Sequence, residues 1–311
     1  MARALRRDPL RGGEKSLICV VGSINTDLVI EVDVIARPGE TIEGKNLTRY
    51  PGGKGANQAV AAARLGAQVA MFGKVGTDPF GDDLYAELLT NGVDTQNVER
   101  ADTSSGLAVI SVAKSGENAI TVVAGANVLV DPDYIDDHLE LLSNCDILLL
   151  QLEIPLDTIG YLLRSLPAER PFVILDPAPA QDISHLLLER IDVLTPNEYE
   201  LDLLTGASDI EGGSRLLVSR GVKNVICTAG AKGAYLTTSN ESTYFPAFPV
   251  EPIDTTAAGD AFNGALAWAL QTRPLNEAIP CACAAGALAT TKKGAQPSLP
   301  QLSELEKILK A

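Results

Sequence analysis

The chain has 311 residues, of which 46% are hydrophobic and 21% charged, a composition typical of a soluble globular protein. It excludes collagen-like, coiled-coil and disordered chains, and no apolar run approaches the ~18 residues that a membrane span needs. With 25 basic and 40 acidic residues the net charge is −15, which repels phosphate backbones and anionic lipids and argues against nucleic-acid and membrane partners.

Residues 1–15 differ from the rest in charge, with five basic and two acidic side chains. They contain no apolar core that could form a signal peptide, so we expect a flexible N-terminal tail. Residues 16–311 show no internal repeat and no low-complexity linker. They are therefore predicted to form one domain.

The cysteines and histidines exclude several kinds of site. The five cysteines are odd in number and contain no CxxC pair, which predicts reduced, mostly buried thiols in a cytoplasmic protein. The two histidines are too few for a histidine-rich zinc site. They also argue against a Ser-His-Asp hydrolase.

Taken in chain order, the elements alternate between strand and helix. A strand is predicted over 17–22, an alanine-rich helix over 57–65, a strand over 69–72 and a helix over about 82–89. Further strands are expected over 147–152, 172–175, 193–195 and 225–228. Their continuous rather than alternating hydrophobicity is typical of strands covered on both faces, so the prediction is an α/β fold with a mostly parallel sheet.

Two stretches interrupt this alternation. Residues 28–50 and 107–123 have no helical period, and the second is typical of a hairpin with a glycine-containing turn at Gly116. We expect the two stretches to pair as antiparallel strands in one small sheet that projects from the body.

The familiar nucleotide signatures are missing. A Walker P-loop needs Gly-Lys followed by Ser or Thr, and no Gly-Lys pair in the chain meets that condition. The first strand is not followed by GxGxxG either, which argues against a dinucleotide oxidoreductase.

A cluster of small residues over 254–260 leads into a predicted helix. Successive backbone N–H groups at a helix N-terminus can bind an anion such as a phosphate. Asp260 would lie in the first turn, where a carboxylate beside a bound phosphate could accept a proton from an attacking hydroxyl. The alternative is an ordinary acidic helix cap.

Polar residues also follow the ends of several predicted strands. Ligands of open α/β sheets bind at the carboxyl ends of the strands, and mixed amide, carboxylate and ammonium groups suit a polyhydroxylated ligand. The residues concerned are Asn25, Asp27, Gly53, Lys54, Asn57 and Glu153. Each could instead be a cap or turn residue.

Asn197 and Glu200 follow another strand. They are compatible with a site for a hydrated metal that rides on phosphates, or with an ordinary helix cap. The loop over 228–233 follows the next strand and by itself indicates only a turn.

Together these motifs resemble the ribokinase family of carbohydrate kinases, over about residues 18–300. The resemblance depends on Pro-Gly-Gly-Lys-Gly-Ala-Asn-Gln-Ala at 51–59, on residues 254–260, and on Asn197-x-x-Glu200 between them. It implies a three-layer αβα sandwich with a small antiparallel β lid, formed by inserted segments at about 28–50 and 104–124.

The resemblance also implies a role for each site residue. Asp260 would be the general base, and the N–H groups of Ala257, Ala258 and Gly259 the anion hole. The sugar would be bound by Asn25, Asp27, Gly53, Lys54, Asn57, Glu153 and Asp260. ATP would be bound by Asn197, Thr228, Ala229, Gly230, Ala231, Lys232, Gly233, Gly259 and Cys283.

Metal ions and partners are implied in the same way. Glu200 would act near Mg²⁺ through water, and a monovalent cation, potassium, would be bound by Asp254, Thr256, Ala289, Lys292, Gly294 and Ser298. The expected substrates are ATP and D-ribose, which is phosphorylated on its 5-hydroxyl, and the expected assembly is a homodimer through the lid.

Two alternatives stay open. One is a kinase of the same family for 2-deoxyribose, fructose or adenosine, and the other is a non-catalytic sugar-binding or regulatory protein. The sequence departs from the family pattern at Ala257, where many relatives have glycine, and at Cys283, where ribokinases can carry histidine.

Overall fold

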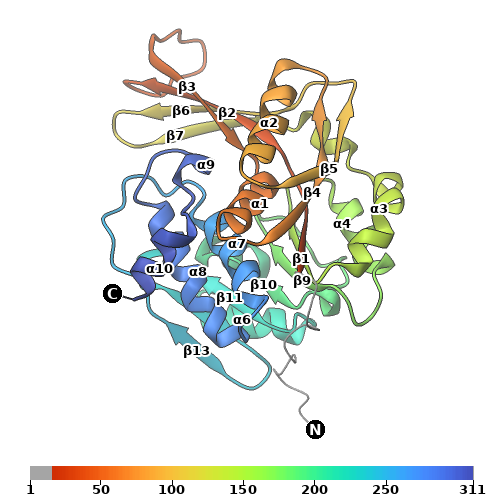
Figure 1. The fold of residues 1–311 in the computed structure, drawn as a ribbon. Helices are drawn as coiled ribbons and strands as arrows, with labels where there is room; N and C mark the ends of the chain where they lie inside the picture. The colour runs from red at the N-terminus through yellow and green to blue at the C-terminus, as the bar shows by residue number, and fades with distance from the viewer. Residues whose placement is uncertain (1–15, 311) are drawn as a thin grey trace.

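The computed structural model describes residues 16–310, and the predicted tail over 1–15 lies outside them. Their main sheet has nine strands (Figure 1). The seven from β11 to β5 are parallel, and at one edge β12 pairs antiparallel with β11 and β13 pairs antiparallel with β12. In spatial order the strands are β13 (Ser242–Phe245), β12 (Ala234–Thr237), β11 (Val225–Thr228), β10 (Val193–Leu194), β9 (Phe172–Asp176), β8 (Ile147–Gln151), β1 (Leu17–Val21), β4 (Gln68–Gly76) and β5 (Asp94–Ala101).

Helices cover both faces of this sheet, because successive side chains of each strand point to opposite sides. Ile18 and Val20 of β1 pack with one group of helices, and Cys19 and Val21 pack with the other. The first group is α1 (Lys54–Arg64), α2 (Pro79–Thr90), α7 (Ala258–Leu270), α8 (Leu275–Ala289) and α10 (Leu302–Leu309). The second is α3 (Pro132–Asn144), α4 (Leu156–Ser165), α5 (Glu198–Thr205) and α6 (Ile210–Ser219). The predicted three-layer sandwich is confirmed.

Shorter helices connect these elements. They are α9 (Ala295–Ser298) and the 3₁₀ turns η1 (Gly125–Leu129), η2 (Leu188–Arg190) and η3 (Gly230–Lys232). None of the helices among residues 16–310 is long and apolar enough to cross a membrane. All five cysteines are buried and free, as predicted.

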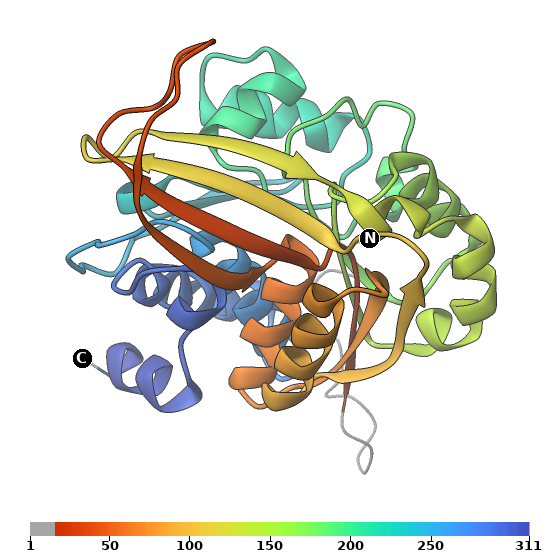
Figure 2. The ribbon, with the colours of Figure 1, turned by 90° about the horizontal axis from the view of Figure 1, so that it is seen from above.

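A second sheet of four strands forms the lid. Its order is β3 (Gly44–Gly52), β2 (Asn25–Val32), β6 (Gly106–Ala113) and β7 (Asn118–Val123), and Figure 2 shows the red and yellow strands side by side above the body. The two hairpins are antiparallel as predicted, but their junction is not, because β2 and β6 pair in parallel. Each hairpin leaves the body on its first strand, so joining the two first strands makes them run in the same direction.

Candidate active site

The site lies where the lid joins the body, at the carboxyl ends of β1, β8 and β9. Helix α1 begins there, directly after Gly53, whose φ of 85° is a left-handed conformation that favours glycine. A Cβ on Gly53 would lie 2.7 Å from the backbone nitrogen of Asn25. The Gly-Gly-Lys-Gly sequence therefore lets α1 start in contact with the first residue of β2.

The start of α1 is tied to the loop after β8. The backbone N–H of Lys54 donates to Glu153 Oε2 at 3.0 Å, and the hydroxyl of Ser23 donates to the same oxygen. On the lid side Asn127 Nδ2 donates to Asn25 Oδ1 at 2.7 Å. These bonds bring Asn25, Lys54 and Glu153 to one edge, as the sequence predicts.

Asp27 points under the end of β3. A Cβ on Gly52 would lie 2.3 Å from Asp27 Oδ2, so the carboxylate occupies the space that a side chain would fill. Burial, together with the nearby carboxylates of Glu153 and Asp260, raises the pKa of Asp27 to about 7. Asp27 therefore lies close enough to these two residues for their charges to interact.

Asp260 lies in the first turn of α7 and is only 5% exposed. Its Oδ2 accepts from Asn57 Nδ2 at 2.9 Å, and its Oδ1 accepts from Gln58 Nε2 at 3.2 Å. Burial raises the pKa of Asp260, while the charge of Lys54 and the two amide donors act in the opposite direction. A carboxylate so placed can accept a proton from a hydroxyl in the pocket.

Lys54 provides the positive charge of this centre. Burial by itself would lower the pKa of Lys54, but nearby carboxylates raise it above its usual range, so the ammonium stays charged. These carboxylates are Asp260, Asp176, Glu153 and Glu200.

The predicted anion hole has one unusual residue. Ala257 caps α7 with a φ of 59°, and it is the only non-glycine residue with positive φ among residues 16–310. The N–H of Ala258 donates to Thr255 O at a long 3.3 Å. A Cβ on Gly259 would meet nothing within 4 Å, so open space lies beside this helix start.

That open space is a cavity of about 470 Å³ with mostly apolar walls. Ala258 and Gly259 border it, and the far side is lined by Phe248, Val250 and Ala287. Six residues predicted to bind ATP line it: Thr228, Gly230, Ala231, Gly233, Gly259 and Cys283. Its apolar walls and its position at the α7 N-terminus suit a purine with its phosphates directed at the helix.

Three predicted ATP residues do not line this cavity. Ala229 is buried and its N–H donates to Gly233 O at 2.8 Å, which closes the loop. The ammonium of Lys232 forms an ion pair with Glu198 at 3.0 Å. Asn197 lies beside Thr228 through a parallel β-bridge.

Asn197 and Glu200 form a capping box at the start of α5. Each side chain accepts the other residue's backbone N–H at 2.8 Å. The cap that the sequence left as an alternative is therefore present. The charge of Glu200 nonetheless acts on Lys54 and Asp176.

The residues predicted to hold a monovalent cation come together only in part. Asp254 Oδ1 accepts from the N–H and the hydroxyl of Thr256, and Asp254 Oδ2 accepts from the Gly294 N–H at 2.9 Å. Although burial opposes it, these bonds hold the pKa of Asp254 below its usual value.

The other three predicted cation residues make local bonds. Ala289 O accepts from Lys292 N at the end of α8, and the buried Ser298 hydroxyl donates to Ala295 O. Among residues 16–310 no group of three or more His, Cys, Asp or Glu side chains is arranged to hold a metal ion.

Five buried polar residues of the site are missing from the sequence predictions. Ser23 bonds to Glu153 and Asn127 to Asn25, whereas Gln58, Gln151 and Asp176 form a hydrogen-bonded group that reaches Asp260. Single residues of these types are common and carry no pattern. The one available signal is position: Gln151 and Asp176 are the last residues of their strands, and Gln58 follows Asn57 in α1.

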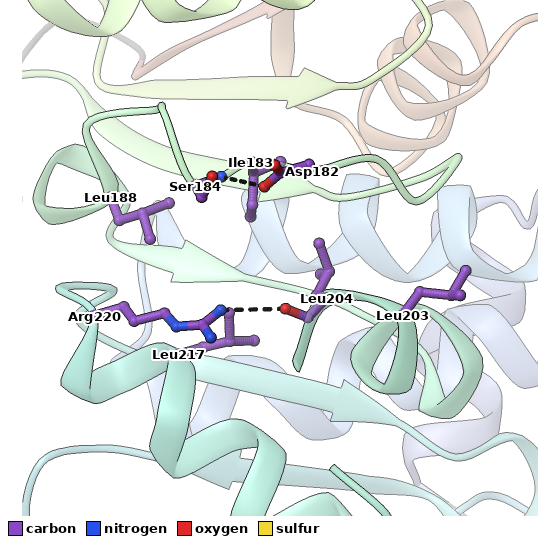
Figure 3. Close-up of a pocket in the computed structure, with 8 residues that line it drawn as sticks. All are labelled: Asp182, Ile183, Ser184, Leu188, Leu203, Leu204, Leu217 and Arg220. Carbon is purple, nitrogen blue, oxygen red and sulfur yellow. Dashed lines mark hydrogen bonds between the residues drawn. The ribbon is translucent and has the colours of Figure 1, made fainter. Parts of the chain in front are cut away.

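A second, smaller cavity of about 140 Å³ lies between α5, α6 and the loop after β9 (Figure 3). Figure 3 shows Arg220 donating to Leu204 O and the Ser184 N–H donating to Asp182. None of the predicted site residues lines it.

Comparison with known proteins agrees with this geometry. The profile of a family described as "pfkB family carbohydrate kinase" matches residues 15–302. The chain is 40% identical to a ribokinase of Haemophilus influenzae over 297 residues, which are 93% of this chain and 97% of that protein. It is 37% identical to a deoxyribokinase of Salmonella typhi over 300 residues, covering 94% and 98%.

A solved structure is similar over almost the whole chain. It is an Arabidopsis thaliana ribokinase in complex with ribose and ATP, with a TM-score of 0.87 and 34% identity. The match covers 96% of this chain and 100% of that one. The similarity therefore includes the lid as well as the main sheet.

Proposed function

This chain belongs to the pfkB family of carbohydrate kinases, and we propose that it is an ATP-dependent ribokinase that phosphorylates the 5-hydroxyl of D-ribose. The observation that carries this proposal is the place of Asp260. It interacts with the carboxylates of Asp27 and Glu153, and it lies in the first turn of α7, whose N-terminus borders the large cavity.

In this proposal Asp260 accepts the proton of the attacking hydroxyl. A carboxylate is a weak base toward an alcohol, so the proton moves late, when the bond to phosphorus is already forming. A loose phosphoryl-transfer transition state permits this order. Most of the rate enhancement then comes from holding the hydroxyl in line with the phosphate, away from water.

The charge that develops on the transferred phosphoryl group would be stabilised at the start of α7. The N–H groups of Ala257, Ala258 and Gly259 form the proposed anion hole, which the helix dipole supports. Lys54, kept charged by its acidic neighbours, would add a positive charge on the sugar side.

Mg²⁺ would enter with ATP, and it would neutralise part of the negative charge of the phosphates. Glu200 fits a role near it, because its capping bond uses Oε2 and a carboxylate has a second oxygen to accept from a metal-bound water. For a monovalent cation, the ionised Asp254 beside Thr256 and Gly294 is a suitable anionic partner. We therefore include Mg²⁺ and potassium in the proposal.

The choice of sugar is tested by coupled ADP release. We expect turnover with Mg-ATP and D-ribose in potassium buffer, and weaker turnover with 2-deoxyribose, fructose or adenosine. The deoxyribokinase relative makes 2-deoxyribose the main competitor. A preference for 2-deoxyribose would replace the proposed substrate, and no turnover with any of the four would favour the non-catalytic alternative.

Assembly and location are part of the same proposal. Strand β7 at the lid edge exposes Ile120 and Val122 by 55% and 56%, and a second copy of the chain could cover this apolar row. We propose a homodimer through the lid, which sedimentation at several protein concentrations would test. The five free thiols support an activity in the cytoplasm.

A further inference from the structure

Behind Asp260 lies a group of buried amides that the proposed reaction does not use directly. Gln151 ends β8 and Asp176 ends β9, and the two are paired in register. Gln58 of α1 faces both. Gln58 and Gln151 are fully buried, and Asp176 is 5% exposed.

These residues form one chain of hydrogen bonds. Gln151 Nε2 donates to Gln58 Oε1 at 2.7 Å. Gln58 Nε2 donates one hydrogen to Asp176 Oδ2 at 2.8 Å and the other to Asp260 Oδ1 at 3.2 Å. Every donor and acceptor atom of the Gln58 amide is therefore used.

This arrangement permits only one orientation of the Gln58 amide. If the amide turned over, its carbonyl oxygen would face two carboxylates and its NH₂ group would face the NH₂ group of Gln151. Gln151 Oε1 fills the space beside Gly22, 2.0 Å from where a Cβ on that residue would be. The bonds to Gln151 and Asp176 thus hold the Gln58 amide from two sides.

We propose that Gln58 is a positioning residue for Asp260, and that Gln151 and Asp176 lock its amide in the donating orientation. The inference rests on the proposed function, in which Asp260 is the base. Gln58 and Asn57 each hold one oxygen of the Asp260 carboxylate, so the group cannot rotate about its Cβ–Cγ bond. A fixed carboxylate presents its free lone pairs to the sugar hydroxyl without reorganisation.

Other charges around Asp260 must stay constant in a test of this role. The charged groups that interact with it come from α1, the lid, the loop after β8 and the end of β9, and they are Lys54, Asp27, Glu153 and Asp176. Glu200 of α5 in turn interacts with Lys54 and Asp176. Gln58→Met leaves all of them in place. It keeps most of the side-chain volume but removes both donated hydrogen bonds.

For Gln58→Met we expect kcat with ribose to fall about 10- to 100-fold, with KM for ribose within about threefold of the wild type. The acid limb of the kcat–pH profile should move to higher pH, because the Asp260 carboxylate loses a donor that stabilises its charged form. A purely structural role would lower the thermal midpoint and leave this limb unchanged.

Three further variants sharpen the test. Asp176→Asn keeps an acceptor for Gln58 and should lose less kcat than Asp176→Leu, which has none. Gln151→Met should shift the acid limb of the kcat–pH profile in the same direction as Gln58→Met. It replaces Gln58→Met in the test if that variant does not fold. Thr237→Val removes a buried hydroxyl bond on β12, away from the site, and should leave kcat and the pH profile unchanged.

The outcomes separate two failures. A wild type that is active with ribose, together with folded Gln58→Met or Gln151→Met variants of normal kcat and pH profile, overturns the positioning role alone. A raised KM with normal kcat assigns Gln58 to sugar binding instead. If the wild type prefers another sugar, the comparison is made with that sugar, and a wild type that phosphorylates none overturns both proposals.

Discussion

Asp254 Oδ2 accepts the backbone N–H of Gly294 at 2.9 Å, across 40 residues of sequence. The bond joins the segment before α7 to the segment between α8 and α9. Two chain segments that could coordinate a cation are thus held together by the one ionised carboxylate of the group.

We therefore expect Asp254→Asn to lose activation by potassium. The amide oxygen can accept the Gly294 N–H while the NH₂ group faces the Thr256 N–H, so the variant should fold with a somewhat lower stability. It lacks the charge that attracts a cation. Rates measured in sodium and in potassium at constant ionic strength provide the check. A wild type that is indifferent to the ion would contradict the cation site, and Glu306→Gln on exposed α10 should respond as the wild type does.

Asp260→Asn should lower kcat at least ~10²-fold, the lower range for acid–base groups. The structure adds a second expectation, because both Asp260 oxygens accept from amide donors. An asparagine must turn its own NH₂ toward one of them, which costs about 1–3 kcal/mol of unfolding free energy. Coupled ADP release measures kcat, and urea unfolding measures the stability. Near-normal turnover would show that Asp260 is not the base.

Ala257→Gly should stabilise the protein. An alanine in the left-handed region costs roughly 1–2 kcal/mol of strain, which glycine avoids. Glycine, however, loses about 0.5–1 kcal/mol more chain entropy than alanine on folding. We expect a net gain of up to about 1 kcal/mol in urea unfolding. Ala258→Gly, one residue later in regular helix, is the matched control and should destabilise. Equal effects of the two substitutions would show that the φ of 59° carries no strain.

The stability of the protein should fall between pH 4 and 7 in part because of Asp27. Burial and the charges of Glu153 and Asp260 raise the pKa of Asp27 to about 7 in the folded state, whereas the unfolded chain releases this proton near the ordinary pKa of 3.8. Rising pH therefore favours the unfolded state across that window. Asp27→Asn removes this contribution, so its unfolding free energy should improve relative to the wild type from pH 4.5 to pH 8.

The same substitution should weaken ribose binding, because Asp27 belongs to the proposed sugar pocket. Urea unfolding at the two pH values and calorimetric titration with ribose test both effects. A stability difference that is the same at pH 4.5 and pH 8 would show that Asp27 titrates normally in the folded protein.

The central strands could be predicted from sequence because they are short, continuous apolar runs. Strand β5, Asp94–Ala101, could not, since it lies at the sheet edge and contains only two apolar residues, Val98 and Ala101. The edge strand β13 was missed for a similar reason, because three of its four residues are exposed. The parallel pairing of β2 with β6 depends on where the hairpins leave the body, which no local pattern contains.

In the site, glycine clusters and strand ends could be predicted because they have a spacing. Gly53 needs its left-handed conformation, and the helix start that follows it places Lys54 and Asn57. Gln58 and Asp176 have no such signature. Gln58 bonds to Asp260 across 202 residues and to Asp176 across 118, so their meeting is a product of the tertiary fold.

Strand β2 belongs to two parts of the molecule at once. It follows β1 of the central sheet after three residues, carries Asn25 and Asp27, and continues into the middle of the lid. A sugar that draws Asn25 and Asp27 inward should therefore also tilt β2, the strand from which the lid extends. We therefore expect one movement of β2 both to select the substrate and to exclude water. The phosphate would then be open to attack only by the molecule whose binding closed the lid.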